Sequence, residues 1–478
     1  MQKIKRLFQT SKTKNGAYSV GLTVIVIAIV VAFNLVIGQI PEKFRNVDVS
    51  STKIYEITNT SRKLLKGLDQ KVTLTVLADK SSTDERIKTF LSKYAALSKN
   101  VSVKWIDPVL HPSALQEYDT SENTIVVKGA KSEKTTTVSF DSIIVQDSSS
   151  YYYTGSTTES EFDGEGQLTS AVNYVTTDVD KTIYRTTGHG EATLSTTISS
   201  LMDKNNYTVT ELNTVMNTEI PDDCDLLFMY APTSDLSADE KTALENYLSK
   251  GGKVMIMLGD TTSQDLPNIA EILKTYGMEE ADGYMADPQR CYQGNYYYIF
   301  PTLSLSGSMS NGISSQMVLL MNAHGLNITD PARDTITTSS FMTTSDSAYA
   351  VTEDGQTQGS YTLGATATET ITDADADSDT DTDADTGKES RLTVVSTASL
   401  IDSQITDTFT QLENATLFMN AVTQNFDGVQ NISIEAKSLT PVYNTVQHAG
   451  LFSLLVIFGI PLIILIAGFT VWFRRRKA

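Results

Sequence analysis

The chain has 478 residues, enough for two or three domains, and its 57 Asp and Glu against 37 Lys and Arg give a formal net charge of −20. Every acidic residue lies between residues 41 and 448, whereas nine of the basic residues lie outside that range. This acidic balance argues against nucleic acid as a partner, because phosphates need a basic face, and it disfavours electrostatic adhesion to anionic lipid.

Two segments, residues 18–40 and 449–473, are apolar over the length of about 20 residues that a helix needs to cross a bilayer. Pro461 lies inside the second segment and predicts a kink rather than a break, because membrane helices tolerate proline. We therefore expect two single transmembrane helices, which would place the protein in contact with membrane lipid.

The orientation follows from the basic flanks. Residues 1–17 and 474–478 carry Lys and Arg without acid, so the positive-inside rule predicts that both tails are cytoplasmic and that 41–448 is extracytoplasmic. A cleaved signal peptide is the alternative at the N-terminus, with an apolar region of about 7–15 residues and a small-x-small cleavage site. The exit from Gly38 to Pro41 offers no such site, which favours an uncleaved anchor in the plasma membrane.

Cys224 and Cys291 are the two cysteines of the sequence. An extracytoplasmic location permits a disulfide, but their spacing does not demand one, so their pairing stays open. The four histidines and two cysteines do not follow a zinc-type spacing, and the sequence predicts neither a metal nor a cofactor.

Residues 41–147 predict a small α/β domain of thioredoxin-like kind, with a β-α-β unit followed by a hairpin. Its expected elements are a helix at 60–68, a strand at 71–78, a helix at 84–97, a strand at 101–106 and hairpin strands at 124–128 and 135–140. A redox role is excluded because this region has no cysteine, so we expect a scaffold or docking domain. Residues 148–180 predict a polar linker followed by a helix.

Residues 181–260 predict the core of a flavodoxin-like α/β domain that extends to 430. Short apolar strands are expected at 182–186, 207–212, 226–231 and 253–258, with amphipathic helices between them. Strands without polar alternation are typical of a parallel sheet that is covered on both faces. Ser237 and Glu240 form a capping-box pattern that begins the second of these helices.

Residues 261–390 predict an insertion, after which a strand at 391–397 and a helix at 410–425 return to the same sheet. Within the insertion, residues 366–388 are predicted as one acidic loop, in which Asp alternates with small residues from Asp373 to Asp385. This pattern is similar to the start of an EF-hand loop, but the central glycine and the closing glutamate are missing, so an acidic disordered loop is the favoured interpretation. Residues 431–448 are expected to form a juxtamembrane segment.

One stretch has the character of a site: Gly188, His189, Gly190 and Glu191, where the first strand ends. Open α/β sheets bind ligands at the carboxyl ends of their strands, and His189 with Glu191 offers an acid and a base. The alternative is structural, with glycines that allow a tight turn and Glu191 at a helix N-terminus. We predict no catalytic residue and a ligand- or partner-binding loop, because a third catalytic member is not visible.

The order of these segments resembles the gliding-motility GldG family, also described as the auxiliary component of an ABC-type uncharacterised transport system. The similarity is carried by residues 55–77, 184–194 with the Gly-His-Gly-Glu turn, 225–258, 392–396 and 414–425, and by a single span at each end. The resemblance implies a membrane-anchored subunit with a domain similar to class I glutamine amidotransferases that lacks their catalytic residues. It also implies an ABC permease and a separate ATPase as partners.

The leading hypothesis is therefore a non-enzymatic accessory protein of an ABC export or motility system. Its outer domains would recognise an extracytoplasmic substrate or brace partner subunits. Two alternatives stay open: a surface hydrolase or amidotransferase-like enzyme that uses His189 and Glu191, and a ligand-binding sensor.

Overall fold

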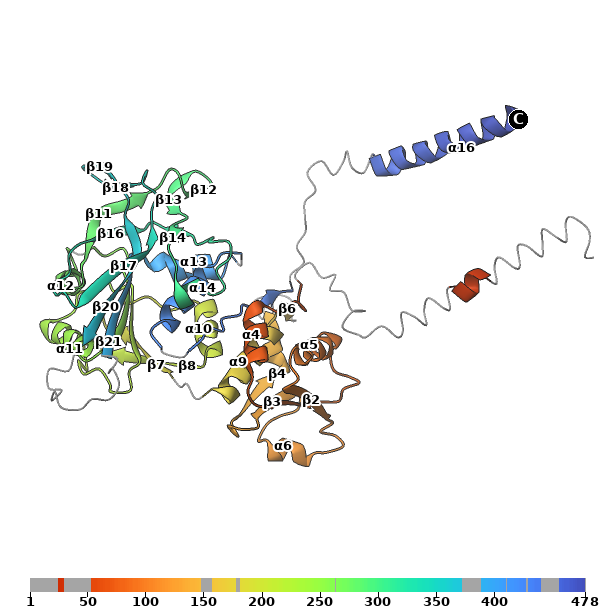
Figure 1. Cartoon of the computed structure of the whole chain (residues 1–478), viewed down its shortest axis with the longest axis horizontal. Helices are drawn as coiled ribbons and strands as arrows, with labels where there is room; N and C mark the ends of the chain where they lie inside the picture. The colour runs from red at the N-terminus through yellow and green to blue at the C-terminus, as the bar shows by residue number, and fades with distance from the viewer. Residues whose placement is uncertain are drawn as a thin grey trace, which may run out of the picture.

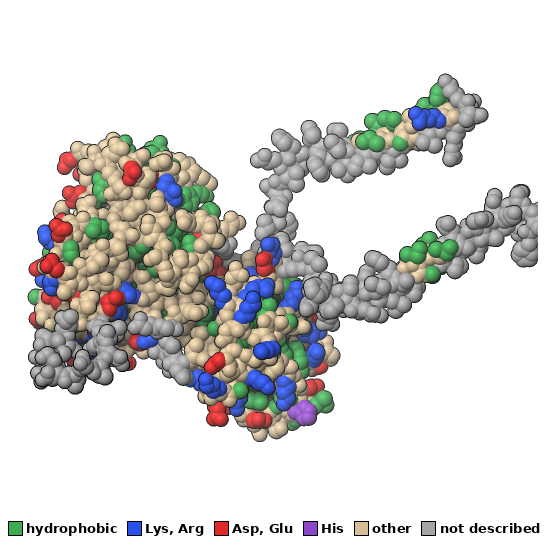
Figure 2. All heavy atoms as spheres, viewed as in Figure 1, with side chains coloured by type: hydrophobic (Ala, Val, Ile, Leu, Met, Phe, Trp, Pro, Cys, Tyr) green, Lys and Arg blue, Asp and Glu red, His purple; other side chains and the backbone are tan. Residues whose placement is uncertain are grey.

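The computed structural model describes residues 25–29, 53–147, 157–177, 181–262, 264–371, 388–409, 411–426, 429–439 and 455–477. Two units lie side by side in Figure 1: a small unit, residues 53–177, and a large unit, residues 181–426. On the face in Figure 2, the Lys and Arg side chains gather on the small unit, whereas they are sparse on the large unit.

The small unit is built on a mixed four-stranded sheet in the order β2-β1-β3-β4. Strand β1 (Val72–Leu77) runs parallel to β2 (Val101–Ile106) and antiparallel to β3 (Thr124–Gly129), which forms a hairpin with β4 (Thr135–Ser139). Helix α5 (Glu85–Ala95) connects β1 to β2, which confirms the predicted β-α-β unit and hairpin. Helices α4 (Asn59–Gly67), α5 and α9 (Gly164–Thr176) contribute to one apolar core with β1.

Part of the stretch predicted as a linker is ordered structure. Strand β6 (Thr158–Phe162) pairs with β5 (Ile144–Asp147) on one side and with β22 (Lys437–Ser438) on the other. Phe162 is buried in the core of the small unit, which the polar composition around it did not reveal. The chain therefore returns to the small unit after it has completed the large one.

The large unit contains five parallel strands in the spatial order β8-β7-β9-β10-β21. Their bounds are β7 (Lys181–Thr187), β8 (Tyr207–Asn213), β9 (Leu226–Tyr230), β10 (Lys253–Met257) and β21 (Lys388–Val395). Numbered along the chain this is the order 2-1-3-4-5, which is the flavodoxin-like doubly wound arrangement. The predicted parallel core, with its returning last strand, is confirmed.

Continuous apolar strands arise here because both faces of the sheet are covered. Along β9, Leu226, Phe228 and Tyr230 enter one apolar core while Leu227 and Met229 enter the other. Helices α10 (Thr196–Lys204) and α14 (Asn414–Thr423) cover the first face, and α11 (Ala238–Ser249) and α12 (Pro267–Thr275) cover the second.

The predicted parallel sheet is only part of the observed one, because the insertion extends it with antiparallel strands and the whole sheet is mixed. They are β11 (Met278–Ala286), β14 (Thr302–Leu303), β16 (His324–Ile328), β17 (Ile336–Thr343), β18 (Tyr349–Thr352), β19 (Gly355–Gln358) and β20 (Thr362–Ile371). Strand β20 pairs with β21 over eight residues, from Gly364 opposite Val395 to Ile371 opposite Lys388. Of the acidic loop expected at 366–388, only 372–387 lies outside the described residues.

Shorter elements complete the two units. They are α6 (Ser113–Glu117), α7 (Phe140–Ile143), the 3-10 helices η1 (Gly307–Ser310) and η2 (Ala398–Ile401), α13 (Ser403–Thr406), and a three-stranded sheet of β12 (Cys291–Tyr292), β13 (Asn295–Ile299) and β15 (Leu320–Met321). Cys224 and Cys291 are both free thiols, so the pairing left open by their spacing does not occur in this structure.

The described residues contain no helix with both the length and the apolar character that crossing a membrane requires. The two predicted spans are therefore not supported. Of the first span, 18–40, only residues 25–29 are described, and the second is described from residue 455 onward. Helix α16 (Ile460–Lys477) has 18 residues, and its last four, 474–477, are all basic, which shortens its apolar part.

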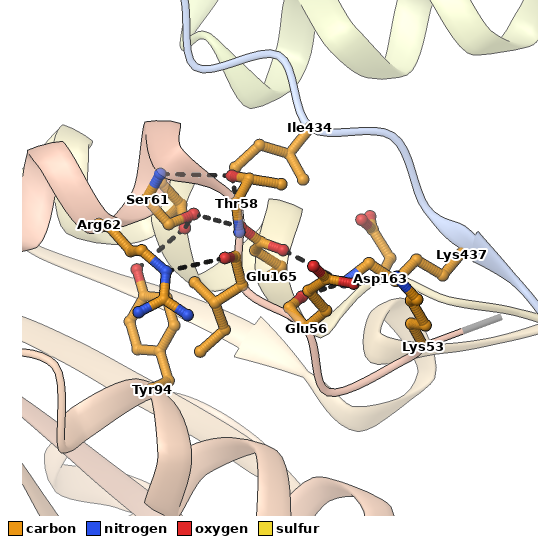
Figure 3. A network of polar contacts seen from close by, with 12 residues as sticks. Lys53, Glu56, Thr58, Ser61, Arg62, Tyr94, Asp163, Glu165, Ile434 and Lys437 are labelled. Carbon is orange, nitrogen blue, oxygen red and sulfur yellow. Dashed lines mark hydrogen bonds and ion pairs between the residues drawn. The ribbon is translucent and has the colours of Figure 1, made fainter. Parts of the chain in front are cut away.

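A polar network in the small unit joins α4, α9 and the returning chain end (Figure 3). The Glu165 carboxylate, 4% exposed, accepts hydrogen bonds at Oε1 from the Thr58 backbone N–H at 2.7 Å, the Thr58 hydroxyl at 2.7 Å and the Ser61 hydroxyl at 2.6 Å. Its Oε2 lies 3.4 Å from Nζ of Lys437. A buried carboxylate needs such partners, so this residue fixes where the three segments meet.

A second polar contact joins the small and large units. Lys204, on α10 of the large unit, is 5% exposed, and its Nζ lies 2.9 Å from Oδ2 of Asp163 in the small unit. The same ammonium donates to the carbonyl oxygen of Ile434 at 3.0 Å. Because both charges are buried, the pairing is specific to one arrangement of the two units and the returning segment.

Candidate functional site

The Gly188–Glu191 turn lies at the topological switch point of the large unit. It follows β7, whose two neighbours, β8 and β9, are both parallel to it. Helices leave this point toward opposite faces of the sheet, and open α/β folds bind ligands in the resulting crevice. The sequence therefore located the turn at the position where this fold places its ligand sites.

The sequence suggested that a helix begins at this turn, and the structure shows that it does not. Helix α10 begins at Thr196, and its N-cap is Ser195, whose hydroxyl accepts from the Ile198 backbone N–H at 3.2 Å. Glu191 lies before this cap and does not stabilise the helix N-terminus. Its carboxylate turns back instead, and its Oε2 accepts from the His189 backbone N–H at 2.7 Å.

The His189 ring lies between two buried carboxylates. Its Nδ1 is 3.6 Å from Oε1 of Glu191, and its Nε2 is 3.2 Å from Oε1 of Glu240. The side chains of His189, Glu191 and Glu240 are 3%, 2% and 6% exposed. Glu240 belongs to the capping box of α11, which the structure confirms: Oε2 accepts from the Ser237 backbone N–H at 2.8 Å. We call these three residues the buried triad.

The pKa shifts favour an imidazolium between two carboxylates. The Glu191 carboxylate beside the ring raises the pKa of His189 and the charge of Glu240 adds to this, although burial acts in the opposite direction. Burial alone would raise the pKa of Glu191, but the His189 ring and backbone N–H groups outweigh it and lower that pKa to about 2. Burial also opposes ionisation of Glu240, yet hydrogen bonds from Ser237 and the charge of His189 lower its pKa.

Two members of the buried triad, His189 and Glu240, have together with Thr214 the spacing of a catalytic group but not its accessibility. The Thr214 hydroxyl lies 3.4 Å from Nδ1 of His189, so Thr214, His189 and Glu240 are spaced like a nucleophile, a base and an orienting acid. Thr214 is only 7% exposed. The space beside Thr186, Thr214 and Glu240 is about 20 Å³, on the order of one water molecule. A substrate cannot enter it in this structure.

The turn instead connects three elements of the large unit. The His189 carbonyl oxygen accepts from the backbone N–H groups of Thr233 at 2.8 Å and Ser234 at 3.1 Å, in the loop after β9. The ring reaches α11 through Glu240. The geometry therefore favours the structural interpretation of the turn. The sequence predicted Glu240 only as part of a capping box and did not place it or Thr214 beside His189, because both come from distant segments.

Gly190 is expected to be a position where alanine is poorly tolerated. Its φ is +73°, and a Cβ there would lie 2.0 Å from Oγ1 of Thr233, a hydroxyl that donates to the His189 carbonyl oxygen. Gly294 has φ +81° with open space around it, so Gly294→Ala measures backbone strain alone, about 1 kcal/mol. Urea unfolding should give Gly190→Ala a further loss of about 1–3 kcal/mol from the clash. Equal losses for the two variants would contradict this packing.

Among the residues that the structure describes, no group of three or more His, Cys, Asp or Glu is placed to hold a metal ion.

A pocket much larger than the space beside Thr214, about 1220 Å³, lies elsewhere on the large unit, beside Tyr284 and His324. No periodic pattern or motif in the sequence predicts this pocket, because its walls come from strands of the insertion and from loops.

The strand order and the closed switch point define a doubly wound α/β domain whose expected ligand position is filled by its own side chains. The chain belongs to the family described as ABC-type uncharacterized transport system, an auxiliary component, whose model matches residues 180–421, just over half of the chain. Residues 51–146 match a domain of unknown function, DUF7088. The predicted family is confirmed at this level.

Comparisons with individual proteins add little. No curated protein matches the chain. The structure titled "mmIFT52 N-terminal domain" has a TM-score of 0.38 and 17% identity, covering 52% of this chain and 98% of that one. A thua-like protein from Parabacteroides merdae has a TM-score of 0.28 and 11% identity, covering 54% and 96%. At such TM-scores neither structure informs the function of this chain.

Proposed function

We propose that this protein is a non-enzymatic auxiliary subunit of an ABC transport system, which braces a permease or presents a substrate to it. The closed buried triad carries the non-enzymatic part of the proposal. His189 has a carboxylate on each side and is 3% exposed, so its proton is held within the fold rather than offered to a substrate. Membership of the family described as an ABC-type uncharacterized transport system supports the proposed role in transport.

The junction between the two units supports a bracing role. A buried ion pair, Lys204 with Asp163, and the Glu165 network tie the small unit, the large unit and the returning segment together. A subunit that transmits force or orientation between partners needs such a defined arrangement, because interdomain contacts are otherwise readily rearranged.

Attachment to the membrane is part of the same proposal. It rests on the sequence: two apolar segments at 18–40 and 449–473, each with a basic cytoplasmic flank, leaving 41–448 outside. Membership of the gliding-motility branch of the family stays a prediction, as does the identity of the permease and the ATPase.

The proposal is tested by tagging the full chain in its native host, crosslinking, and purifying it from detergent-solubilised membranes. We expect an ABC permease and an ATPase to copurify, and an unrelated tagged membrane protein to serve as control. Retention in the membrane fraction after an alkaline carbonate wash tests the proposed membrane attachment independently of the partners. Recovery of the crosslinked chain without either transporter subunit would reject the proposal.

A further inference from the structure

The pocket of about 1220 Å³ lies where β11, the β18–β19 hairpin, the loop after β10 and the β12-β13-β15 sheet meet. Strands β11, β12, β13, β18 and β19 gather at one end of the large unit in Figure 1, where the insertion extends the main sheet. Small-molecule sites usually occupy about 300–1,000 Å³, so this pocket has room for a ligand of that class or for a peptide segment.

A two-residue bulge in β11 shapes one wall. Ala281 pairs with Gly325 and Tyr284 with His324, so Asp282 and Gly283 are extra residues in the register with β16. Gly283 has φ +82°, and a Cβ there would lie 2.1 Å from the carbonyl oxygen of Val351. Only glycine fits, and bulges of this kind re-aim neighbouring groups beside binding sites.

The bulge also sets the hydrogen-bonding state of His324, which lines the pocket and is 3% exposed. Its Nδ1 is 3.0 Å from the Gly283 carbonyl oxygen and 3.6 Å from Oε1 of Glu280. The carbonyl can only accept a hydrogen bond, so Nδ1 carries the proton. In the neutral ring Nε2 is then an acceptor. Nε2 is buried and makes no hydrogen bond to any described part of the chain, so the pocket wall contains an acceptor that lacks a donor.

The charge of the pocket has one sign. Four carboxylates line it, those of Glu280, Asp282, Glu353 and Asp354, and no Lys or Arg is among the lining residues that the structure describes. Tyr284 and Tyr297 also line it and are 37% and 38% exposed. Carboxylates attract cations, and tyrosine rings bind ammonium and guanidinium groups on their faces.

We propose that this pocket binds an organic cation through ammonium or guanidinium groups, either a free oligoamine or the Lys and Arg side chains of a peptide segment. The carboxylates supply the attraction, the tyrosines supply contact area, and Nε2 of His324 accepts an N–H of the ligand. This site is distinct from the buried triad and does not depend on the proposed transport role.

The test is calorimetric titration of the purified full chain with spermidine and, separately, with a tri-arginine peptide, near 0.1 M salt so that charges beyond about 10 Å are screened. At least one amine is expected to bind with 1:1 stoichiometry. The Glu353→Gln/Asp354→Asn variant changes only the exposed turn between β18 and β19, so it should fold normally. It should weaken binding about tenfold or more, because it removes two charge-assisted contacts.

The matched control is Asp330→Asn/Asp334→Asn, which removes the same charge from exposed positions outside the pocket. Binding in this control should equal that of the unmodified chain, and the ¹⁵N resonance of His324 Nε2 should shift when amine is added. Binding of spermidine alone identifies a free oligoamine as the source, and binding of the peptide alone identifies a basic segment. Absence of binding by both amines, equal weakening in both double variants, or an unmoved His324 resonance at saturation would overturn the proposal.

Discussion

Replacing His189 with alanine is expected to lower the free energy of unfolding of the large unit by about 3–5 kcal/mol, because it leaves the buried carboxylates of Glu191 and Glu240 without their cation. Urea unfolding followed by circular dichroism measures the loss. His111→Ala is the matched control, since His111 is exposed in the small unit and the same substitution there should change stability by less than about 0.5 kcal/mol.

The charge explanation has its own test. Converting the triad to His189→Gln, Glu191→Gln and Glu240→Gln removes all three charges while keeping polar side chains of similar size. This triple variant should be more stable than His189→Ala, because an unpaired buried charge costs more than a neutral group. If the triple variant were the less stable of the two, loss of packing rather than loss of charge pairing would explain the effect.

The triad also predicts how stability depends on pH. The pKa of His189 is raised in the folded chain, so its contribution is complete below its ordinary value of 6.5 and is lost as pH rises through the raised value. The pKa of Glu191 is lowered to about 2, so its contribution is present above 4.5 and is lost as pH falls toward 2. Stability of the large unit should therefore be greatest between these limits, and His189→Ala should flatten the alkaline side.

Lys204→Met is expected to cost about 3–5 kcal/mol and to loosen the contact between the two units, because it leaves Asp163 buried without a partner charge. It also removes the donor to the Ile434 carbonyl oxygen. Urea unfolding gives the cost, and small-angle scattering tests whether the units separate. Lys131→Met is the control: Lys131 pairs with Asp69 at 3.0 Å, but both are more than half exposed, so the loss should stay below about 1 kcal/mol.

Glu435 makes this junction sensitive to pH. Burial raises its pKa to about 7, an effect that the nearby Lys204 charge opposes. Since the folded-state pKa lies above the ordinary value of 4.5, the stability it contributes is present below 4.5 and is lost as pH rises toward 7. Lys204→Met should enlarge this loss.

The prediction for Lys204→Met at neutral pH can also fail. An unchanged radius of gyration together with a stability loss below about 1 kcal/mol for Lys204→Met would contradict a tight junction.

Local signals in the sequence predicted the elements whose causes are local. The Ser237 and Glu240 pattern placed the start of α11, and the observed capping box begins that helix at Ala238. Apolar runs predicted β9 and β10 as doubly covered strands, and both divide their side chains between two cores. Strand β20 was missed because most of what it buries is small: Ala365 and Ala367 enter one core, and Leu363 is its one large buried apolar side chain.

The candidate turn shows where local reasoning stops. Two glycines beside His189 and Glu191 located the turn at the end of β7, and the family resemblance rested partly on it. Glu191 was predicted to lie at a helix N-terminus, but the helix begins at Thr196, five residues later. The pocket beside His324 escaped detection altogether, since a bulge in β11 and a hairpin turn at Glu353 contribute to it from separate strands.

The sequence by itself determined which segments form the parallel strands, which amphipathic helices cover them and the family to which the chain belongs. Only the tertiary structure decided what the Gly188–Glu191 turn does, because the second carboxylate facing His189 comes from α11, a different element. Burial and pairing set the protonation of His189, and both depend on which segments meet in space rather than on spacing along the chain.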